Sequence, residues 1–210
     1  MDTFNIWTRR QFIAVSGAAA LSPAAFAEEL TKTPKQVEGP YYPDKMPLDT
    51  DNDLLIINDS MSQAVGQVTH LGGRILDQRG DPIRNAVVEI WQVDNEGVYL
   101  HTKDNRGRMD KNFQGFGRFM TGTKGEYYFR TIKPVQYGNR RPAHIHYAVY
   151  RNNKRVLTTQ CYVSGDERLK TDRLIKSSGP LEGNPLVVDF LPVKGSKLGE
   201  LQANFDIVLG

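Results

Sequence analysis

The sequence predicts an all-β fold, an antiparallel β-sandwich with an irregular N-terminal arm and at most one or two short helices. From Val65 onward, short strand-like segments are separated by turns rich in glycine and aspartate, and no long amphipathic helical pattern interrupts them. This spacing is typical of sandwiches and barrels. The 210 residues, 39% of them hydrophobic, suffice for one core and do not require a second full domain.

The first 27 residues have the composition of an export signal, so we exclude them from the fold. Arg9 and Arg10 precede a short apolar run that ends in Ala25-Phe26-Ala27, an A-x-A type cleavage site. Serine, glycine and proline interrupt the run, and a bilayer span takes about 20 apolar residues. The paired arginines are similar to a twin-arginine signal, which predicts a periplasmic or secreted protein that begins at Glu28.

Residues 28–65 are predicted to form an extended N-terminal arm that lies over the domain. The segment EGPYYPD, residues 38–44, cannot be helical because two prolines and a glycine break it. A free linker is the alternative, but the adjacent Tyr41 and Tyr42 argue against it, since a linker gains nothing from aromatic surface that it cannot bury.

Residues 66–210 form the predicted sandwich domain. Its strands are predicted at residues 67–76, 85–93, 117–123, 126–132, 143–150, 155–163, 186–190 and 204–209. One short helix is predicted in residues 165–177, where acidic residues come early and lysines late, as the helix dipole favours. Cys161 is the only cysteine and is predicted to be buried on a strand, so the core must stabilise the fold without an intrachain disulfide.

The charge pattern limits the partners. The net charge is +3, and basic and acidic residues are interspersed without a basic stripe, so we expect no nucleic acid partner. The mature chain also has no predicted membrane span.

Two histidines on one predicted strand form half of a candidate metal site. Pro142 suits the first position of a strand, because it lacks an N–H. Side chains alternate along the residues that follow, so His144 and His146 point the same way while Ile145 faces the opposite side. Imidazoles at this spacing can bind one ion, although such pairs also occur as structural histidines.

Tyrosines near this strand offer further donors. Tyr137 lies in the loop that precedes the strand, and Tyr99 follows the turn at residues 94–97. A phenolate together with imidazoles suits a ferric ion better than zinc. Only a strongly charged ion would keep a phenol with a pKa of about 10 ionised at neutral pH. The residues alone do not distinguish Tyr99 from Tyr127, Tyr128 or Tyr147.

At these residues the chain resembles the intradiol ring-cleavage dioxygenases, and in particular a catalytic core of the protocatechuate 3,4-dioxygenase type. The resemblance runs through EGPYYPD, EIWQVDNEGVYLH, GFGRFMTGTKGEYYFRTIKP, RPAHIH and LTTQCYVSGD to FDIVL. It implies Fe(3+) as the cofactor and a catechol-type substrate that reacts with O2. The implied metal ligands are Tyr99, Tyr137, His144 and His146.

The resemblance also implies the reaction. The catechol ring is cleaved between its two hydroxylated carbons to give a cis,cis-muconate type diacid. Arg141 and Gln160 line the substrate side and stabilise developing negative charge on oxygen, and Tyr137 also accepts a substrate proton. Family members of this type form homo- or hetero-oligomers, so the resemblance implies an oligomer of either kind.

Two other functions stay open from the sequence. A periplasmic protein could bind a ferric catecholate without turning it over, or the sandwich could be a module without a metal. An extradiol enzyme would use ferrous iron with two histidines and one carboxylate, but no acid stands in a comparable place beside His144 and His146.

The remaining polar and aromatic candidates receive simpler interpretations. His70 is predicted to be structural, and one of Tyr127 and Tyr128 is predicted to face the core while the other is exposed. A solvated loop is predicted for His101, Lys103, Arg106 and Arg108, and the alternative for the three basic residues is that they attract a carboxylated substrate.

Overall fold

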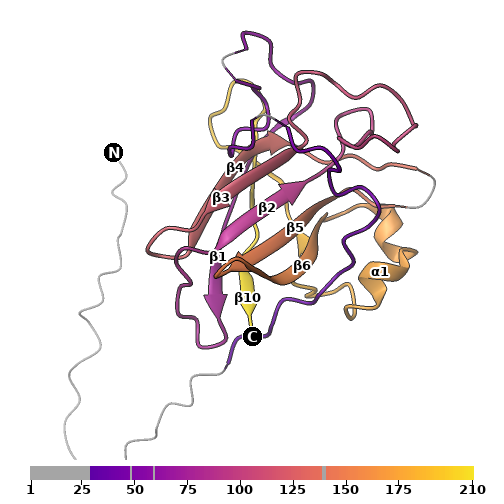
Figure 1. Cartoon of the computed structure of the whole chain (residues 1–210). Coiled ribbons are helices and arrows are strands. Elements are labelled where there is room, and N and C mark those ends of the chain that lie inside the picture. Colours follow the sequence, from indigo (N-terminus) through magenta and orange to yellow (C-terminus); the bar gives the residue numbers. More distant parts are fainter. Residues whose placement is uncertain (1–28, 48, 59, 139–140) are drawn as a thin grey trace, which may run out of the picture.

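A computed structural model describes residues 29–210 except residues 48, 59, 139 and 140. The predicted signal, with Arg9, Arg10 and the cleavage site at residues 25–27, lies outside the described residues. Two β-sheets share one hydrophobic core in the part that is described (Figure 1), so the predicted all-β sandwich is confirmed. No helix in this part is long and apolar enough to cross a membrane.

The first sheet is built around β1 (Val68–Asp77), its longest strand. β1 pairs antiparallel with β4 (Glu126–Ile132) and parallel with β9 (Leu201–Asn204) and β10 (Ile207–Leu209). The short β8 (Leu191–Pro192) completes the sheet beside β9. The C-terminal strands thus return alongside β1 in the same direction, an arrangement that the predicted antiparallel order did not include.

The second sheet carries the histidine pair. Its order is β3 (Phe116–Met120), β2 (Val87–Trp91), β5 (His144–Arg151), β6 (Lys154–Val163) and β7 (Val187–Val188). All neighbours are antiparallel except β6 and β7. β5 therefore lies at the centre of this sheet, where both of its edges are hydrogen-bonded and its side chains are held on defined faces.

Alternation along the strands builds the core, as the sequence predicts. Tyr127 faces inward and is 3% exposed, whereas its neighbour Tyr128 is 39% exposed. Ile145 and Cys161 are fully buried in the main core cluster, opposite each other in the β5–β6 register. The histidines on either side of Ile145 consequently face away from this cluster.

The predicted short helix is present as two separate turns. A 3-10 helix, η1, covers Glu167–Lys170, and α1 covers Arg173–Lys176. Asp166 and Asp172 are the two N-caps, and the Asp172 carboxylate accepts hydrogen bonds from the backbone N–H groups of Leu174 and Ile175. The second cap starts a new turn at the point where the sequence predicts one continuous helix.

The arm crosses both sheets. The backbone N–H of Thr33 donates to Val208 at 3.0 Å, and that of Gln36 donates to Thr158 at 2.8 Å. Further on, Arg118 of β3 donates to Thr50 at 2.9 Å, and Arg130 of β4 donates to Asn52 at 2.8 Å. The arm, indigo in Figure 1, thereby covers the edges of β3 and β4, which would otherwise expose unpaired backbone groups.

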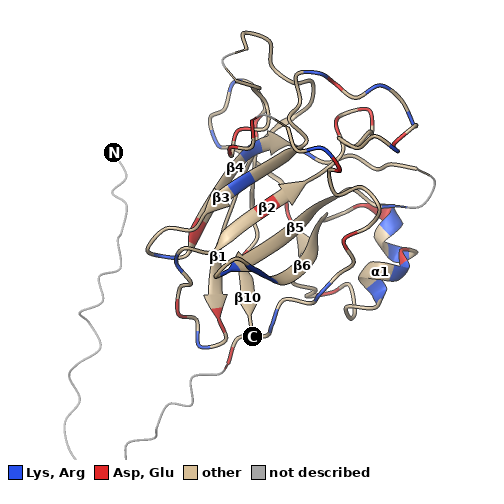
Figure 2. Ribbon diagram, viewed as in Figure 1, with Lys and Arg blue, Asp and Glu red and all other residues tan. Residues whose placement is uncertain are grey.

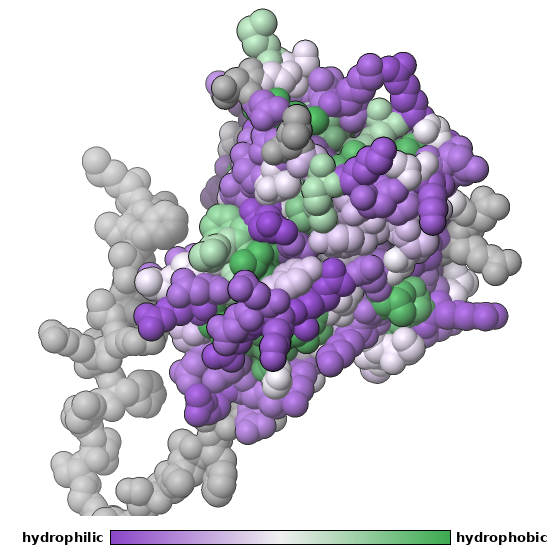
Figure 3. Space-filling model, viewed as in Figure 1, coloured by the Kyte–Doolittle hydropathy of each residue, from purple (hydrophilic) through white to green (hydrophobic). Residues whose placement is uncertain are grey.

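The described surface is polar and mixed in charge. Figure 2 shows acidic and basic residues interspersed along the loops. The face in Figure 3 is mostly hydrophilic, with small and separate hydrophobic patches. The described part of this face therefore offers no large apolar surface for a partner.

Candidate metal centre

Four donor atoms from three parts of the chain converge at the start of β5. The Nε2 atoms of His144 and His146 are 3.2 Å apart. Tyr99 Oη lies 2.8 Å from His146 Nε2, and Tyr137 Oη lies 3.4 Å from His144 Nε2. The two phenol oxygens are 3.3 Å apart. The structure thus brings together all four side chains that the resemblance implied as metal ligands.

The histidines are oriented by different contacts. His144 Nδ1 lies 2.7 Å from the carbonyl oxygen of Pro142, and donation from Nδ1 leaves the Nε2 lone pair directed at the cluster. His146 has no hydrogen-bond partner at its buried Nδ1. Its ring instead stacks on Trp91, with a centroid distance of 4.9 Å and an angle of 7°. Trp91 lies directly opposite His146 in the β2–β5 register, so the sheet itself positions this stack.

Burial determines the protonation of these groups. Both histidine side chains are buried, and burial followed by the charge of Arg141 lowers the pKa of His144 to about 3. Burial, with His144 as a second cause, also lowers the pKa of His146. Both imidazoles are therefore neutral at neutral pH and can bind a metal. Burial raises the pKa of Tyr99 and of Tyr137, so neither phenol ionises there unless a cation is bound.

The tyrosines come from two loops. Tyr99 follows β2, and its backbone N–H donates to Asp104 Oδ2 at 2.8 Å. Tyr99 is 2% exposed and packs against the arm through Tyr41, whose ring stacks on it at 5.2 Å. Tyr137 belongs to the loop before β5 and is only half-buried. Of the two phenols, Tyr137 is therefore the freer to move.

The donor set fits a hard, highly charged metal ion. Bonds of about 2.0–2.1 Å to one ion place neighbouring donors about 2.9–3.4 Å apart, which matches the observed 2.8–3.4 Å. Among the described residues, no group of three or more His, Cys, Asp or Glu side chains could hold a metal. The site instead offers two imidazoles and two phenols, and phenolate oxygen favours a ferric ion.

Arg141 and Gln160 lie together beside this cluster. An Arg141 Nη atom donates to Gln160 Oε1 at 2.7 Å and to the Tyr162 hydroxyl at 3.2 Å. Gln160 is fully buried, opposite His146 in the β5–β6 register, and its amide donates to Val37 of the arm at 2.9 Å. Arg141 Nε lies 3.0 Å from Asp172 Oδ2, an ion pair that lacks hydrogen-bond geometry.

A cavity borders Arg141 on its other side. It has a volume of about 470 Å³ and is lined by Arg141 together with residues 171–174. Asp172, whose carboxylate pairs with Arg141, is one of the lining residues and lies between η1 and α1. These two turns therefore position the arginine at the edge of the cavity.

One loop residue contradicts the prediction of a solvated loop. The His101 side chain is only 8% exposed, and its ring meets Tyr41 edge-on at 5.7 Å, because Tyr41 of the arm folds onto this loop. Lys103, Arg106 and Arg108 are exposed, as predicted. The Arg106 guanidinium nevertheless lies over the rings of Tyr41, Tyr99 and Tyr137, contacts that the prediction did not include.

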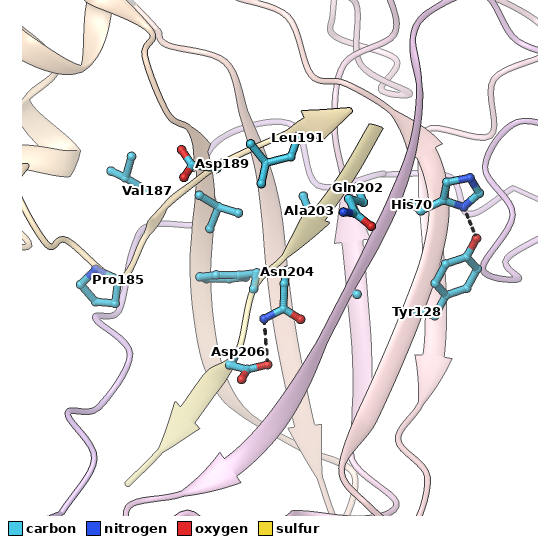
Figure 4. A pocket seen from close by; sticks show the side chains of 13 residues that line it. His70, Tyr128, Pro185, Val187, Asp189, Leu191, Gln202, Ala203, Asn204 and Asp206 are labelled. Atoms are coloured by element: carbon cyan, nitrogen blue, oxygen red, sulfur yellow. Dashed lines mark hydrogen bonds between the residues drawn. The ribbon is translucent and has the colours of Figure 1, made fainter. Parts of the chain in front are cut away.

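A different cavity, of about 710 Å³, lies against the first sheet (Figure 4). His70 lines it and contacts the Tyr128 hydroxyl at 2.6 Å and Glu200 at 3.3 Å, which agrees with its predicted structural role. Asn204 and Asp206 line another part of it. None of the six predicted site residues reaches this cavity, so its volume does not mark the site that the sequence predicted.

The residues that support the site were harder to predict. Three of them, Trp91, Asp104 and Asp172, contact site residues from other segments of the chain. No local sequence pattern predicts such contacts. The adjacent tyrosines of the arm were a usable signal, because they indicated packing that only a neighbouring aromatic surface could provide.

Comparison with known proteins defines the class. The family described as Dioxygenase matches residues 37–210, and the chain belongs to this family. Within it, the chain is an intradiol ring-cleavage dioxygenase, as the similar proteins below are. It is 36% identical over 168 residues to the protocatechuate 3,4-dioxygenase beta chain of Burkholderia cepacia, a match that covers 76% of this chain and 71% of the relative.

Catechol 1,2-dioxygenases are similar over a smaller share of their length. The enzyme of Acinetobacter baylyi is 34% identical over 151 residues, which cover 64% of this chain and 47% of that protein. Its counterpart from Acinetobacter sp. ADP1, solved with bound mercury, superposes with a TM-score of 0.65 at 30% identity, covering 84% of this chain and 62% of the other.

A shorter solved structure is similar to this chain over almost its whole length. The dioxygenase domain of a dioxygenase and carbohydrate-binding protein fusion from Streptomyces sp. SirexAA-E superposes with a TM-score of 0.64 at 28% identity. The match covers 85% of this chain and 98% of the domain.

Proposed function

We propose that this dioxygenase is iron(III)-dependent and cleaves a catechol-type diol between its two hydroxylated carbons with O2. The product is a cis,cis-muconate type diacid that contains both oxygen atoms of O2. The observation that carries the proposal is the convergence of two imidazole nitrogens and two phenol oxygens, each of which lies 2.8–3.4 Å from two of the others. The likeness to named protocatechuate and catechol dioxygenases supports it.

In this proposal the ligands are Tyr99, Tyr137, His144 and His146. When bound, ferric iron would act as a Lewis acid that draws electron density from a chelated catecholate and opens its ring to attack by O2. The neutral, buried imidazoles bind through Nε2 without first losing a proton. Each phenol must lose its proton, so metal binding releases protons from the two tyrosines.

Tyr137 is the proposed acceptor of a substrate proton. It is the more exposed of the two tyrosines, whereas Tyr99 is 2% exposed and packs under Tyr41 of the arm. The phenolate Oη of Tyr137 would accept one hydroxyl proton of the diol. Its neighbour His144 stays neutral and is not the acceptor, because burial holds its pKa at about 3.

Arg141 and Gln160 are the proposed groups that stabilise negative charge as it develops on oxygen. The guanidinium is already oriented by Gln160, Tyr162 and Asp172, so little reorganisation is needed when charge appears. Dioxygenases named for protocatechuate, catechol and hydroxyquinol resemble this chain, and we therefore propose the substrate class and not one catechol.

Labelled oxygen tests the reaction. Protein loaded with Fe(3+) is mixed with a panel of catechols under 18O2, without reductant, and the product is analysed by mass spectrometry. We expect a ring-opened diacid with two labelled atoms. Unlabelled product, or the semialdehyde of cleavage outside the two hydroxyl groups, would contradict the proposal, and tight binding of every catechol without oxygen uptake would identify a ferric-catecholate binding protein.

The colour of the loaded protein tests the ligands separately. Tyrosinate bound to ferric iron gives a visible charge-transfer band, which should weaken in Tyr99→Phe and in Tyr137→Phe. Tyr127→Phe is the matched control, since Tyr127 is buried in the main core and should leave the band unchanged. A colourless protein that purifies with zinc alone would refute the ligand set.

We also propose export through a twin-arginine type signal, on the basis of the first 27 residues. The mature protein should then begin at Glu28. Replacing Arg9 and Arg10 by lysine should leave the protein in the cytoplasm, and a soluble cytoplasmic wild-type protein that retains residues 1–27 would contradict the proposal.

A further inference from the structure

We propose that Arg106 is a positioning residue that holds the Tyr137 and Tyr99 rings at the metal centre and stabilises their phenolate charge. The inference rests on the proposed function, because it requires both tyrosines to bind ferric iron as anions. It concerns a residue for which the sequence predicts a solvated loop or attraction of a carboxylated substrate, and no role at the metal centre.

The first observation is one guanidinium placed over three aromatic rings. The Arg106 Cζ atom lies 4.5 Å from the ring centroid of Tyr137, 5.0 Å from Tyr41 and 5.6 Å from Tyr99. All three distances fall within the range of about 6 Å in which a cation and an aromatic ring attract each other. Two of these rings belong to the proposed ligands, so Arg106 contacts the metal centre through its tyrosines.

The second observation is the way in which Arg106 is held. Its Nε donates to Asp104 Oδ1 at 2.8 Å, and an Nη atom pairs with Asp104 Oδ2. Asp104 is fully buried and also accepts the backbone N–H of Tyr99. Asp104 therefore ties the guanidinium and the backbone of one proposed ligand to the same carboxylate.

A fixed cation matters more when the rings become phenolates. A neutral ring attracts the guanidinium only through its quadrupole, whereas a tyrosinate attracts it as a charge as well. The attraction is greatest at the shortest distance, so the effect on Tyr137 should exceed the effect on Tyr99. Tyr137 is also the more exposed of the two tyrosines, and Arg106 restrains its ring in addition to the backbone bridge that Tyr137 forms with Arg141.

A purely structural role is the competing explanation. Arg106 would then serve only to neutralise Asp104, and its removal would lower the stability of the protein without acting on the tyrosines in particular. The two explanations differ in what Arg106→Met does to the charge-transfer band. Removing a cation raises the energy of the phenolate electrons, so the band should move to longer wavelength only if Arg106 acts on a bound tyrosinate.

The experiment is a double-mutant cycle in the iron-loaded full chain. Arg106→Met, Tyr137→Phe and the double variant are titrated with Fe(3+), and iron affinity and band position are recorded. We expect Arg106→Met to shift the band to longer wavelength and to weaken iron binding roughly 2- to 30-fold, the range that one cation–π contact provides. In the Tyr137→Phe background, most of this shift should disappear.

Two further variants separate fold from function. Arg108→Met removes an exposed arginine of the same loop and should change neither quantity. Arg106→Lys keeps the charge, and it should retain more iron affinity than Arg106→Met and shift the band less, even if the methionine variant is unstable.

The results distinguish this inference from the proposed function. Normal iron binding with an unchanged band in Arg106→Met overturns the inference alone, as does a shift of the same size in the Tyr137→Phe background. A wild-type chain that takes up no ferric iron overturns the proposed function and this inference together.

Discussion

Replacing Arg141 by alanine should separate turnover from stability and iron binding. The Arg141 side chain donates to Gln160 and Tyr162 and to none of the four proposed ligands among the described residues, and alanine keeps the backbone bridge to Tyr137, so iron and colour should be retained. If it stabilises a developing oxyanion, its loss should raise the activation free energy by about 2 kcal/mol or more. This lowers kcat per bound iron by a factor of about 30 or more.

The same change should destabilise the fold. The Asp172 side chain is 5% exposed and would lose its cationic partner, but it keeps two backbone N–H donors. We therefore expect a loss of about 1–3 kcal/mol in the free energy of unfolding, less than the full cost of an unpaired buried charge. Denaturant unfolding of the iron-free protein measures this loss.

A second variant decides between the two effects. Adding Asp172→Asn to Arg141→Ala removes the unpaired charge and keeps the side-chain oxygen that caps α1, so stability should recover while turnover stays low. Oxygen uptake per bound iron is the assay. If the double variant regains wild-type turnover, or if Arg141→Ala stays within about threefold of wild type, Arg141 does not act on the reaction.

Two other perturbations address the histidines. Trp91→Leu removes the ring on which His146 stacks at 4.9 Å and should weaken iron binding about 2- to 10-fold in protein that is still folded, whereas Trp91→Phe should weaken it less; equal affinities in wild type and Trp91→Leu would show that the stack is not needed. Iron-free protein should lose stability as the pH falls from about 6.5 to 3, because the unfolded state protonates His144 in this window and the native state, with a pKa of about 3, does not. The loss due to His144 is absent above pH 6.5 and is complete below about pH 3, where the native state is protonated as well. Unfolding free energies measured over this window should fall less steeply for His144→Gln, and identical slopes would contradict the burial argument.

The strand that carries the histidines was predictable because its information is local. Alternation places His144 and His146 on one face and Ile145 on the other, and the structure has this arrangement. The alternation of Tyr127 and Tyr128 was predictable for the same reason. In contrast, β9 spans four residues and pairs with β1 far away in the chain, so its pairing is a tertiary effect that no local pattern indicates.

The site was only partly predictable, for a related reason. A strand determines where its side chains point, but a loop such as the one that carries Tyr99 takes its conformation from distant contacts, and only the resemblance selected Tyr99 from the other tyrosines. The error at His101 and the unforeseen contacts of Arg106 have the same origin. Their loop is covered by Tyr41, which comes from an arm whose course over the sandwich the sequence does not specify.

The arm has a consequence for the order of folding. Thr33 bonds to Val208, 175 residues away, so the first part of the arm cannot dock before β10 has been synthesised. Closing so long a loop is entropically costly and comes late, when most local contacts already exist. Val37, which holds Gln160, and Tyr41, which covers Tyr99, belong to the same arm. A newly made chain should therefore complete its sandwich first and acquire a high-affinity iron site last, so a ribosome-bound chain that lacks β10 should bind iron weakly although β5 is already present.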